Sequence, residues 1–388
     1  MILNRPVLRA IAVALALAGA AIPAHALVSL EDGRDHVFVT GNFGIAYDSN
    51  VFTNKNSGGD STISYGLTVE ITRQAGWIGV NASVSVQAQT YDHDTTQDFA
   101  NPAFSAEFTK QTGRTTGSLT LAAQEESRAD VAVNTRDTSW NYNAGLNFKY
   151  PVIERYSISG SLGYGLVDYT NKQLFTDLST YSASVDLYYV LSDARDLFGG
   201  YRYRYEPTDK HSFDVDNAFT VGVSGKVYGP INGSLRVGYQ FRDDHSPITT
   251  THYGDFTGSA SLSSNLNRAT TISLTASKDF STTASDTSLD SNTVDIAVQH
   301  AVTAKFALTG DVGGGYNDYL GDGGRIVPGD LTSAHRRDEF FNWGAAANYT
   351  FNQHLKVSLG YTFYENWSNL SFAVFTRQNY SLYLTSRW

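Results

Sequence analysis

Apolar and polar residues alternate with a period of two along most of the chain. In VFVTGNFGIAYD, residues 37–48, the side chains of Val39, Phe43, Ile45 and Tyr47 fall on one parity, and mostly small or polar residues fill the other. The same alternation recurs in STISYGLTVEIT, SWNYNAGLNFKY and LKVSLGYTFY. Because successive side chains of a strand point to opposite faces, each segment is predicted to be a β-strand with one apolar face. No comparable stretch has the 3.6-residue period of an amphipathic helix.

The connections between these strands alternate in length. Tight links such as RQAGW, PVIER and FNQH alternate with longer polar links such as NVFTNKNSGGDST and DHDTTQDFANP. Short turns on one side and long loops on the other are typical of bacterial outer-membrane barrels. The spacing predicts an all-β, antiparallel up-and-down transmembrane barrel of about 18 strands, or about 16 if one segment is divided wrongly, each roughly 12–16 residues long. The pattern does not fix where the strands begin and end around residues 104–109, 256–262 and 373–380.

The chain ends in QNYSLYLTSRW, where Tyr380, Leu382, Leu384 and Trp388 share a parity. This pattern predicts a strand that runs to the last residue. In a bilayer no backbone group can stay unpaired, so the sheet must close. We therefore expect the last strand to pair with the first, near residues 37–47.

The first residues have the pattern of an export signal. Arg5 and Arg9 precede a short apolar run that ends in Ala-His-Ala. This arrangement predicts a cleaved signal peptide over residues 1–26. A short periplasmic segment, 27–36, would then lead into the barrel at 37–388.

Composition agrees with a strand-rich membrane protein. Charged residues make up only 17% of the 388 residues, below the roughly 25% of ordinary soluble domains. Aromatic residues reach 13%, and they gather toward the predicted strand ends, as in the two girdles of such barrels. The net charge of −10 argues against a nucleic-acid partner. The absence of cysteine excludes disulfides, thiolate metal sites and a cysteine nucleophile.

Residues 42–52, NFGIAYDSNVF, form a first strand that opens into an Asp-x-Asn-x-Phe-type loop. This stretch resembles the putative beta-barrel porin 2 family of outer-membrane proteins. The resemblance implies porin-like passage, with some members associated with exopolysaccharide systems, and it supplies no catalytic residues. The aromatic last residue, Trp388, resembles the assembly signal of outer-membrane barrels. It implies the outer membrane of a Gram-negative-type bacterium, with membrane lipid and the barrel assembly machinery as partners.

The inner wall is the predicted place for selectivity. The parity of the strands places one basic and one acidic set of side chains toward the lumen: Arg202, Arg204, Arg236 and Arg242, and Glu70, Glu107, Asp186, Asp295 and Asp311. Facing rows of opposite charge would set a field across the enclosed water. Alternatively, Asp186 pairs with Arg202 and the other side chains are simply solvated.

Three other segments offer less specific chemistry. The loop YDHDTTQD contains Asp92, His93, Asp94 and Asp98, which is compatible with a cation site or a surface hydrolase, although a solvated acidic loop is favoured. The loop at 320–338 brings Arg325, Arg336 and Arg337 either into the pore as a constriction or to the outside. The glycine run at 310–316 lacks the Lys-Ser/Thr of a phosphate loop and suits a barrel wall.

These features favour a passive channel for small hydrophilic solutes or saccharides. We expect no enzyme activity, cofactor or metal. An exopolysaccharide-export barrel is the nearest alternative, and a structural barrel, an adhesin or a surface hydrolase is the next.

Overall fold

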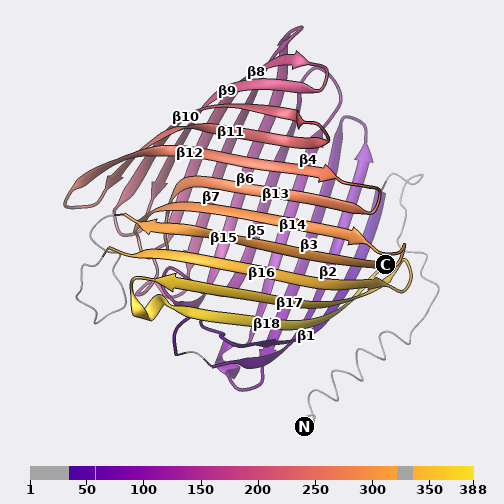
Figure 1. Cartoon of the computed structure of the whole chain (residues 1–388), viewed down its shortest axis with the longest axis vertical. Helices are drawn as coiled ribbons and strands as arrows, with labels where there is room; N and C mark the ends of the chain where they lie inside the picture. The colour runs from indigo at the N-terminus through magenta and orange to yellow at the C-terminus, as the bar shows by residue number, and fades with distance from the viewer. Residues whose placement is uncertain (1–34, 57, 321–334) are drawn as a thin grey trace.

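The computed structural model describes residues 35–56, 58–320 and 335–388. Its strands form one closed antiparallel sheet of 18 members, in which each strand pairs with its neighbours in sequence and β1 (Asp35–Asp48) also pairs with β18 (Phe375–Arg387). Figure 1 shows the flattened barrel, with β11–β18 on the near side and β2–β7 behind them. The predicted class is confirmed, with 18 strands rather than 16.

The strands are 12 to 19 residues long. Those between β1 and β18 are β2 (Asp60–Ala75), β3 (Ile78–Tyr91), β4 (Phe99–Lys110), β5 (Thr116–Asp130), β6 (Thr135–Ile153), β7 (Tyr156–Tyr169), β8 (Leu178–Ser192), β9 (Arg195–Pro207), β10 (Phe213–Tyr228), β11 (Ile231–His245), β12 (Thr250–Asn265), β13 (Thr270–Thr282), β14 (Ser288–Ala301), β15 (Phe306–Tyr319), β16 (Arg337–Thr350) and β17 (Leu355–Ser368). Two 3-10 turns, η1 (Thr95–Gln97) and η2 (Ser371–Ala373), lie in loops. None of the described segments is a helix long and apolar enough to cross a membrane.

Two bounds differ from the sequence-based prediction. β1 begins at Asp35, two residues before the predicted start, and β6 has 19 residues, beyond the predicted range. The predicted signal peptide lies outside the described residues. The link between β5 and β6 covers only residues 131–134.

The seam between the first and last strands closes the barrel. The register runs from Thr40 opposite Arg387 to Asp48 opposite Asn379, which confirms the predicted pairing. The main chain of Trp388 continues this ladder, because Trp388 and Val39 exchange two N–H···O bonds of 2.8 Å each. The indole of Trp388 stacks on the ring of His354 at 4.5 Å. The terminal residue is therefore built into the wall.

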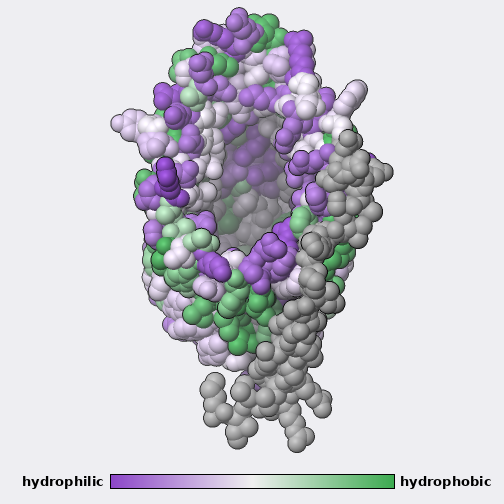
Figure 2. Space-filling model, turned by 90° about the vertical axis from the view of Figure 1, so that its right-hand side faces the viewer, coloured by the Kyte–Doolittle hydropathy of each residue, from purple (hydrophilic) through white to green (hydrophobic). Residues whose placement is uncertain are grey.

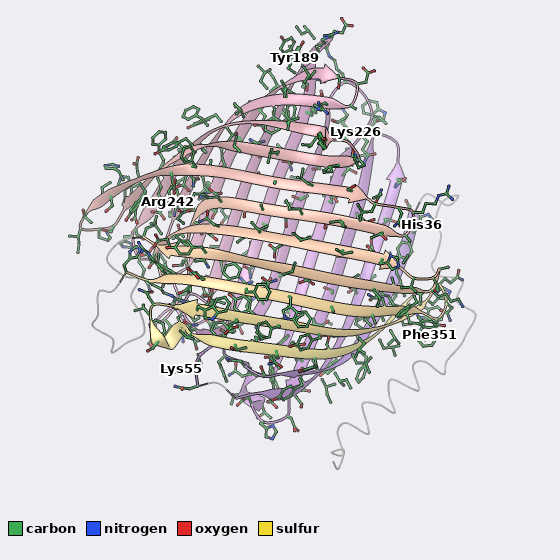
Figure 3. The ribbon with its side chains drawn as sticks, viewed as in Figure 1. His36, Lys55, Tyr189, Lys226, Arg242 and Phe351 are labelled. Carbon is green, nitrogen blue, oxygen red and sulfur yellow. The ribbon has the colours of Figure 1, made fainter. Side chains whose placement is uncertain are left out.

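The two ends of the barrel differ in their connections. At one end most links are tight turns, such as residues 76–77, where Gly76 takes a φ of 69° that favours glycine. Both ends of the barrel sequence lie here, and so do His36, Lys226 and Phe351 in Figure 3. Arg242 lies toward the opposite end. We call these the short-turn end and the long-loop end.

The outer face of the wall is apolar, as the parity predicted. Val84, Leu359 and Phe219 are each more than half exposed on this face. The predicted aromatic positions at both ends include highly exposed side chains, with Trp77 81% and Tyr228 77% exposed by short turns. Most buried side chains, in contrast, gather toward the long-loop end.

Two ladders of the wall stop before the long-loop end. The β4–β5 ladder ends at Ala103 opposite Gln124, beside Pro102, which has no amide hydrogen to offer. The β12–β13 ladder ends at Gly258 opposite Lys278, although β12 begins eight residues earlier, at Thr250. The outer ends of the β5–β6 and β13–β14 hairpins are therefore not paired to the strands that precede them.

Both hairpins turn inward where they leave the wall. Arg136 of β6 shares its parity with outward-facing Tyr142, yet its guanidinium lies over the rings of Tyr91 and Phe99, which face inward from β3 and β4. Phe280 of β13 likewise has an outward parity but is only 2% exposed, and it lies under the guanidinium of Arg242. The outer surfaces of the two hairpin ends thus pack against the inner wall.

We predict that deleting Trp388 lowers the yield of folded barrel more than it changes the conductance of those molecules that fold. The deletion removes two backbone hydrogen bonds at the seam, each contributing about 1 kcal/mol, and the stack on His354. Heat-modifiable migration on gels measures the folded fraction. Trp388→Phe is the matched control, because it keeps the main-chain bonds and a ring. A normal folded yield from the deletion would contradict the prediction.

Candidate functional site: the lumen and its outer mouth

The lumen opens at the short-turn end. Figure 2 views this end directly and shows a hollow whose walls carry mainly hydrophilic residues. On the inner wall of β4–β8 lies a cavity of about 600 Å³ lined largely by hydroxyl, amide and charged side chains, among them Glu107, Lys149, Ser161, Asp186 and Arg236. The inner positions of the strands are mostly Ser, Thr, Asn and Gly, so the wall is polar with few fixed charges.

Asp186 and Arg236 form an ion pair in the lumen. Nη1 and Nη2 of Arg236 on β11 each donate to a carboxylate oxygen of Asp186 on β8 at 2.9 Å, across the two intervening strands. Gly200 leaves the space that the Asp186 carboxylate occupies, since a Cβ at this position would lie 1.8 Å from Asp186 Oδ1. The guanidinium of Arg236 also lies over the ring of Phe198, at 4.5 Å. The alternative prediction that Asp186 pairs with Arg202 is wrong. The side chain of Arg236 extends over Gly200 and pairs with the Asp186 carboxylate instead.

Arg202 and Arg204 instead contact the inward hairpin. Arg202 donates to both oxygens of Asp279 on β13, at 2.8 and 2.6 Å. Arg204 donates to Asp216 on the neighbouring strand at 2.7 Å and to Asp279 at 3.3 Å. These two arginines therefore link the wall at β9 to the end of β13.

Arg242 is fully buried and does not line open water. Its guanidinium donates to Asp216 at 2.6 Å and to Glu206, and it lies 3.3 Å from Asp214. Removing one partner of a buried charge pair typically costs about 3–5 kcal/mol, because the remaining charge is stranded. This group of arginines and carboxylates holds the structure together, and each arginine is balanced by neighbouring acids rather than by a distant acidic row.

The same side chains satisfy the free edge of β13. On this edge Thr257 Oγ1 donates to the carbonyl of Lys278 at 2.9 Å and Arg204 donates to the carbonyl of Phe280. A missing strand neighbour would otherwise leave these carbonyls unpaired in a buried place. Side chains of the wall thus take the role that β12 has lower down the ladder.

The predicted acidic residues divide into two groups. Glu70 pairs with Arg387 at 2.9 Å near the short-turn end; such a partly exposed pair contributes at most about 1 kcal/mol. The side chains of Glu107, Asp295 and Asp311 face the lumen, and within the described residues no cationic group lies at ion-pair distance from them. Asp295 lies over Gly313 and Asp311 lies over Gly344, where an added Cβ would approach the carboxylates to 2.0 and 2.7 Å.

The long-loop end is covered by chain segments from opposite sides of the barrel. The tip of the β13–β14 hairpin contributes Ala284 to a buried cluster with Tyr169 and Phe175, and Val133 from the β5–β6 tip packs against it. Thr176 donates its amide to the carbonyl of Ala284 at 2.8 Å. The two inward hairpins therefore meet over the mouth, together with the β7–β8 loop.

The loop at 320–338 is only partly described, and Arg325 lies outside the described residues. Arg336 is buried and donates to the carbonyls of Ala132 and Val131, at 2.6 and 3.0 Å, and to Asp338. Arg337 is exposed on the outer face and lies 3.6 Å from Asp318. Arg336 therefore anchors the β5–β6 tip, and Arg337 points away from the lumen.

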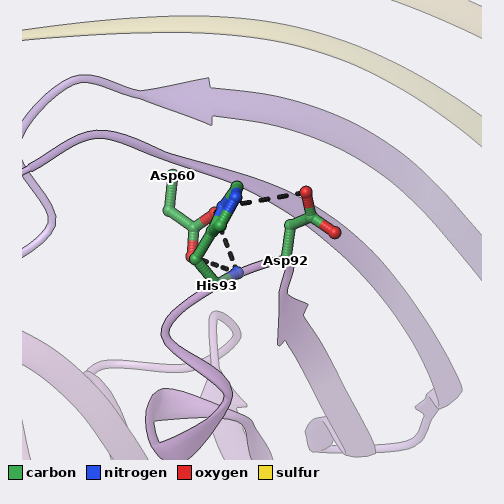
Figure 4. A group of neighbouring side chains, drawn as sticks. All are labelled: Asp60, Asp92 and His93. Atoms are coloured by element: carbon green, nitrogen blue, oxygen red, sulfur yellow. Dashed lines mark hydrogen bonds and ion pairs between the residues drawn. The ribbon is translucent and has the colours of Figure 1, made fainter. Parts of the chain in front are cut away.

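The acidic loop after β3 is organised around Asp60, which sequence reasoning did not single out. Figure 4 shows Asp60 with Asp92 and His93. The Asp60 carboxylate accepts the amides of His93 and Asp94, at 3.0 and 2.8 Å, and contacts His93 Nδ1 at 3.0 Å. The hydrogen bond to Asp60 and the charge of Asp92 raise the pKa of His93. Because N–H donors already occupy this carboxylate, its geometry supports a loop anchor better than a cation site.

A closed barrel with an even number of antiparallel strands, an apolar outer face and a polar lumen defines a porin-like protein of the bacterial outer membrane. Its short-turn end is then periplasmic and its long-loop end is extracellular. In agreement with the resemblance found in the sequence, the model of the putative beta-barrel porin 2 family matches residues 214–387, from β10 almost to the end of the chain.

No curated protein sequence matches the chain. Among solved structures, the FrpB iron transporter from Neisseria meningitidis (F3-3 variant) aligns at a TM-score of 0.49 and 10% identity over 85% of this chain, which spans 62% of the length of that protein. OpdK with vanillate and OccK2 (OpdF) with glucuronate, both from Pseudomonas aeruginosa, align at 0.49 and 0.48 with 9% and 10% identity. They cover 91% and 92% of this chain and 99% and 96% of their own.

Proposed function

We propose that the barrel is a channel for the passive passage of small hydrophilic solutes or saccharides across the outer membrane. The observation that carries this proposal is the hydrophilic hollow that opens at the periplasmic end, with its cavity of about 600 Å³. A barrel of this strand number is wide enough to hold water. Its wall offers many weak hydrogen-bonding groups, which let a polar solute exchange water for wall contacts without being held tightly.

The charges of the lumen support a preference for cations. Arg202, Arg204, Arg236 and Arg242 are each paired with carboxylates on nearby strands, so they set no strong field across the lumen. Glu107 on β4, and Asp295 and Asp311 on β14 and β15, have no such partner in the described chain and lie on opposite walls. Uncompensated carboxylates attract cations and repel anions in a water-filled pore. In place of the predicted basic row facing an acidic row, we therefore infer a weakly acidic lumen.

The alternatives find less support. The tyrosines of the YRYRY run, residues 201–205, have outward parity, and Tyr203 is 39% exposed on the outer face, so they form no sugar-binding row inside the lumen for exopolysaccharide export. The Asp60–His93 contact anchors a loop, which weakens the basis for a surface hydrolase. A structural barrel is the alternative with a specific observation in its favour, the segments packed over the extracellular mouth.

We predict that the purified barrel gives stepwise currents in a planar lipid bilayer. A water-filled lumen conducts small ions whatever its preferred solute, whereas a purely structural barrel does not. Heat-denatured protein from the same preparation is the control. Folded protein that stays silent over a range of voltages would contradict the channel.

We further predict that the combined changes Glu107→Gln, Asp295→Asn and Asp311→Asn lower the cation-to-anion permeability ratio by about twofold or more, because they remove the unpaired lumen charges. The reversal potential in a KCl gradient measures this ratio. Glu339→Gln, on the outer face of β16, is the matched control and should leave it unchanged. An unaltered reversal potential in the triple variant would refute the assignment of these carboxylates.

A further inference from the structure

We propose that the outer end of the β13–β14 hairpin, residues 279–288, is the extracellular gate of this channel. The inference rests on the proposed function, since a gate requires a conducting lumen. In the conformation described above the gate is closed. It opens when the hairpin end leaves the lumen and β13 extends its ladder with β12.

The hairpin end lacks the constraint that fixes the rest of the wall. Above Gly258 and Lys278 no described strand pairs with the edge of β12 that faces β13. β13 itself continues for four residues past the last pair and is laddered there only to β14. Since a barrel wall otherwise pairs its strands on both sides, an interrupted ladder, as found here and at β4–β5, lets a segment move without unzipping the barrel.

The free edge of β12 also defines where the hairpin would go. Continuing the observed register places Asp279 opposite Thr257, Phe280 opposite Phe256 and Ser281 opposite Asp255. In that arrangement Phe280 would face outward beside Phe256, which is 70% exposed and already packs against Tyr239. The side chain that is buried under Arg242 in the closed state would thus join the outer aromatic row. Phe280 thus has an apolar environment in both positions, under Arg242 when the hairpin is inside and beside Phe256 when β13 pairs with β12.

When the hairpin leaves, the Arg202–Asp279 ion pair is lost, and both side chains, which are already partly exposed, become solvated in the lumen. Arg204 bonds the carbonyl of Phe280, which in the zipped ladder would be bonded by an amide of β12. Arg242 bonds the carbonyl of Ser281, which lies on the edge that faces β14 and needs no partner from β12. When the hairpin leaves, Arg204 and Arg242 both keep Asp216 on their own side of the wall. The carbonyl of Phe280 therefore has a partner in both states, and Arg204 and Arg242 keep a carboxylate in both, as a two-position element requires.

The tip of the hairpin is held by few contacts. It contributes one small side chain, Ala284, to the apolar cluster at the mouth, and one accepted amide from Thr176. Ser212 in the β9–β10 loop donates to Asp286 at 2.5 Å. The opposing β5–β6 tip is anchored more firmly, because Arg336 bonds two of its carbonyls and Asn134 donates to the carbonyl of Thr53. Below its tip the β13–β14 end is held by Arg202, Arg204 and Arg242, so the gate opens only when these contacts are released.

The absence of native cysteine allows each state to be trapped. Ser212→Cys with Asp286→Cys, joined by a short reducible bis-methanethiosulfonate cross-linker, holds the hairpin inside. Asp255→Cys with Ser281→Cys forms a disulfide only in the zipped register. Ser83→Cys with Ser105→Cys, whose hydroxyls lie 2.8 Å apart within the β3–β4 wall, is the matched control. Heat-modifiable migration confirms that each variant folds, and conductance is recorded in planar bilayers before and after reduction.

The gate predicts that the inward cross-link abolishes the stepwise current and that reduction restores it. It also predicts that the zipped disulfide forms and keeps the channel conducting, while the wall control has no effect. A current that is the same with and without the inward cross-link would overturn the gate and leave the channel standing. Failure of the Asp255–Ser281 pair to form a disulfide would overturn the zipped open state. Silence of every folded variant, reduced or not, would overturn the proposed function and the gate with it.

Discussion

The structure depends on one constraint: in a bilayer every backbone N–H and C=O of the wall needs a partner within the protein. An open sheet would leave two bare edges, so the first and last strands must meet, and the exchange of hydrogen bonds between Trp388 and Val39 completes that closure. Closure gives the outer face to lipid and the inner face to water. The alternation of apolar and polar residues along each strand follows from this division.

The same constraint explains how side chains bond the wall at one of the two places where a ladder stops. At the extracellular end of β12 and β13 the ladder stops, and the carbonyls of Lys278 and Phe280 on the free edge of β13 are bonded by Thr257 and Arg204. Arg204 takes the place of a strand amide, and carboxylates surround Arg204 and Arg242 because buried charges need partners. Arg202, Arg204 and Arg242, which the sequence suggests as selectivity elements, thus hold the segment that covers the extracellular mouth. The polar hollow below this segment is the space that we propose for the solute.

Much of the fold could be predicted from the sequence, because period-two alternation fixes the face of each residue. The inward parity of Arg202 and the outward parity of Tyr203 followed from the pattern alone. The pairing partners could not be predicted, because parity gives the face of a side chain but not how far it extends along that face. Arg236 pairs with Asp186 only because Gly200, which has no side chain, leaves room for it to cross two strands. Asp60 was missed because its role comes from loop amides that local sequence cannot place. The break between β12 and β13 falls in a segment, 256–262, whose bounds the sequence also left open.

The proposed water-filled path for polar solutes through the folded barrel is tested most directly by liposome swelling. Proteoliposomes containing the folded protein are diluted into isosmotic solutions of uncharged sugars of increasing size. The account predicts swelling with the smallest sugars at a rate that falls as the solute grows, since the lumen is polar but bounded by its walls and mouth. Swelling rates equal to those of protein-free liposomes for every sugar, with the barrel shown to be folded, would contradict it.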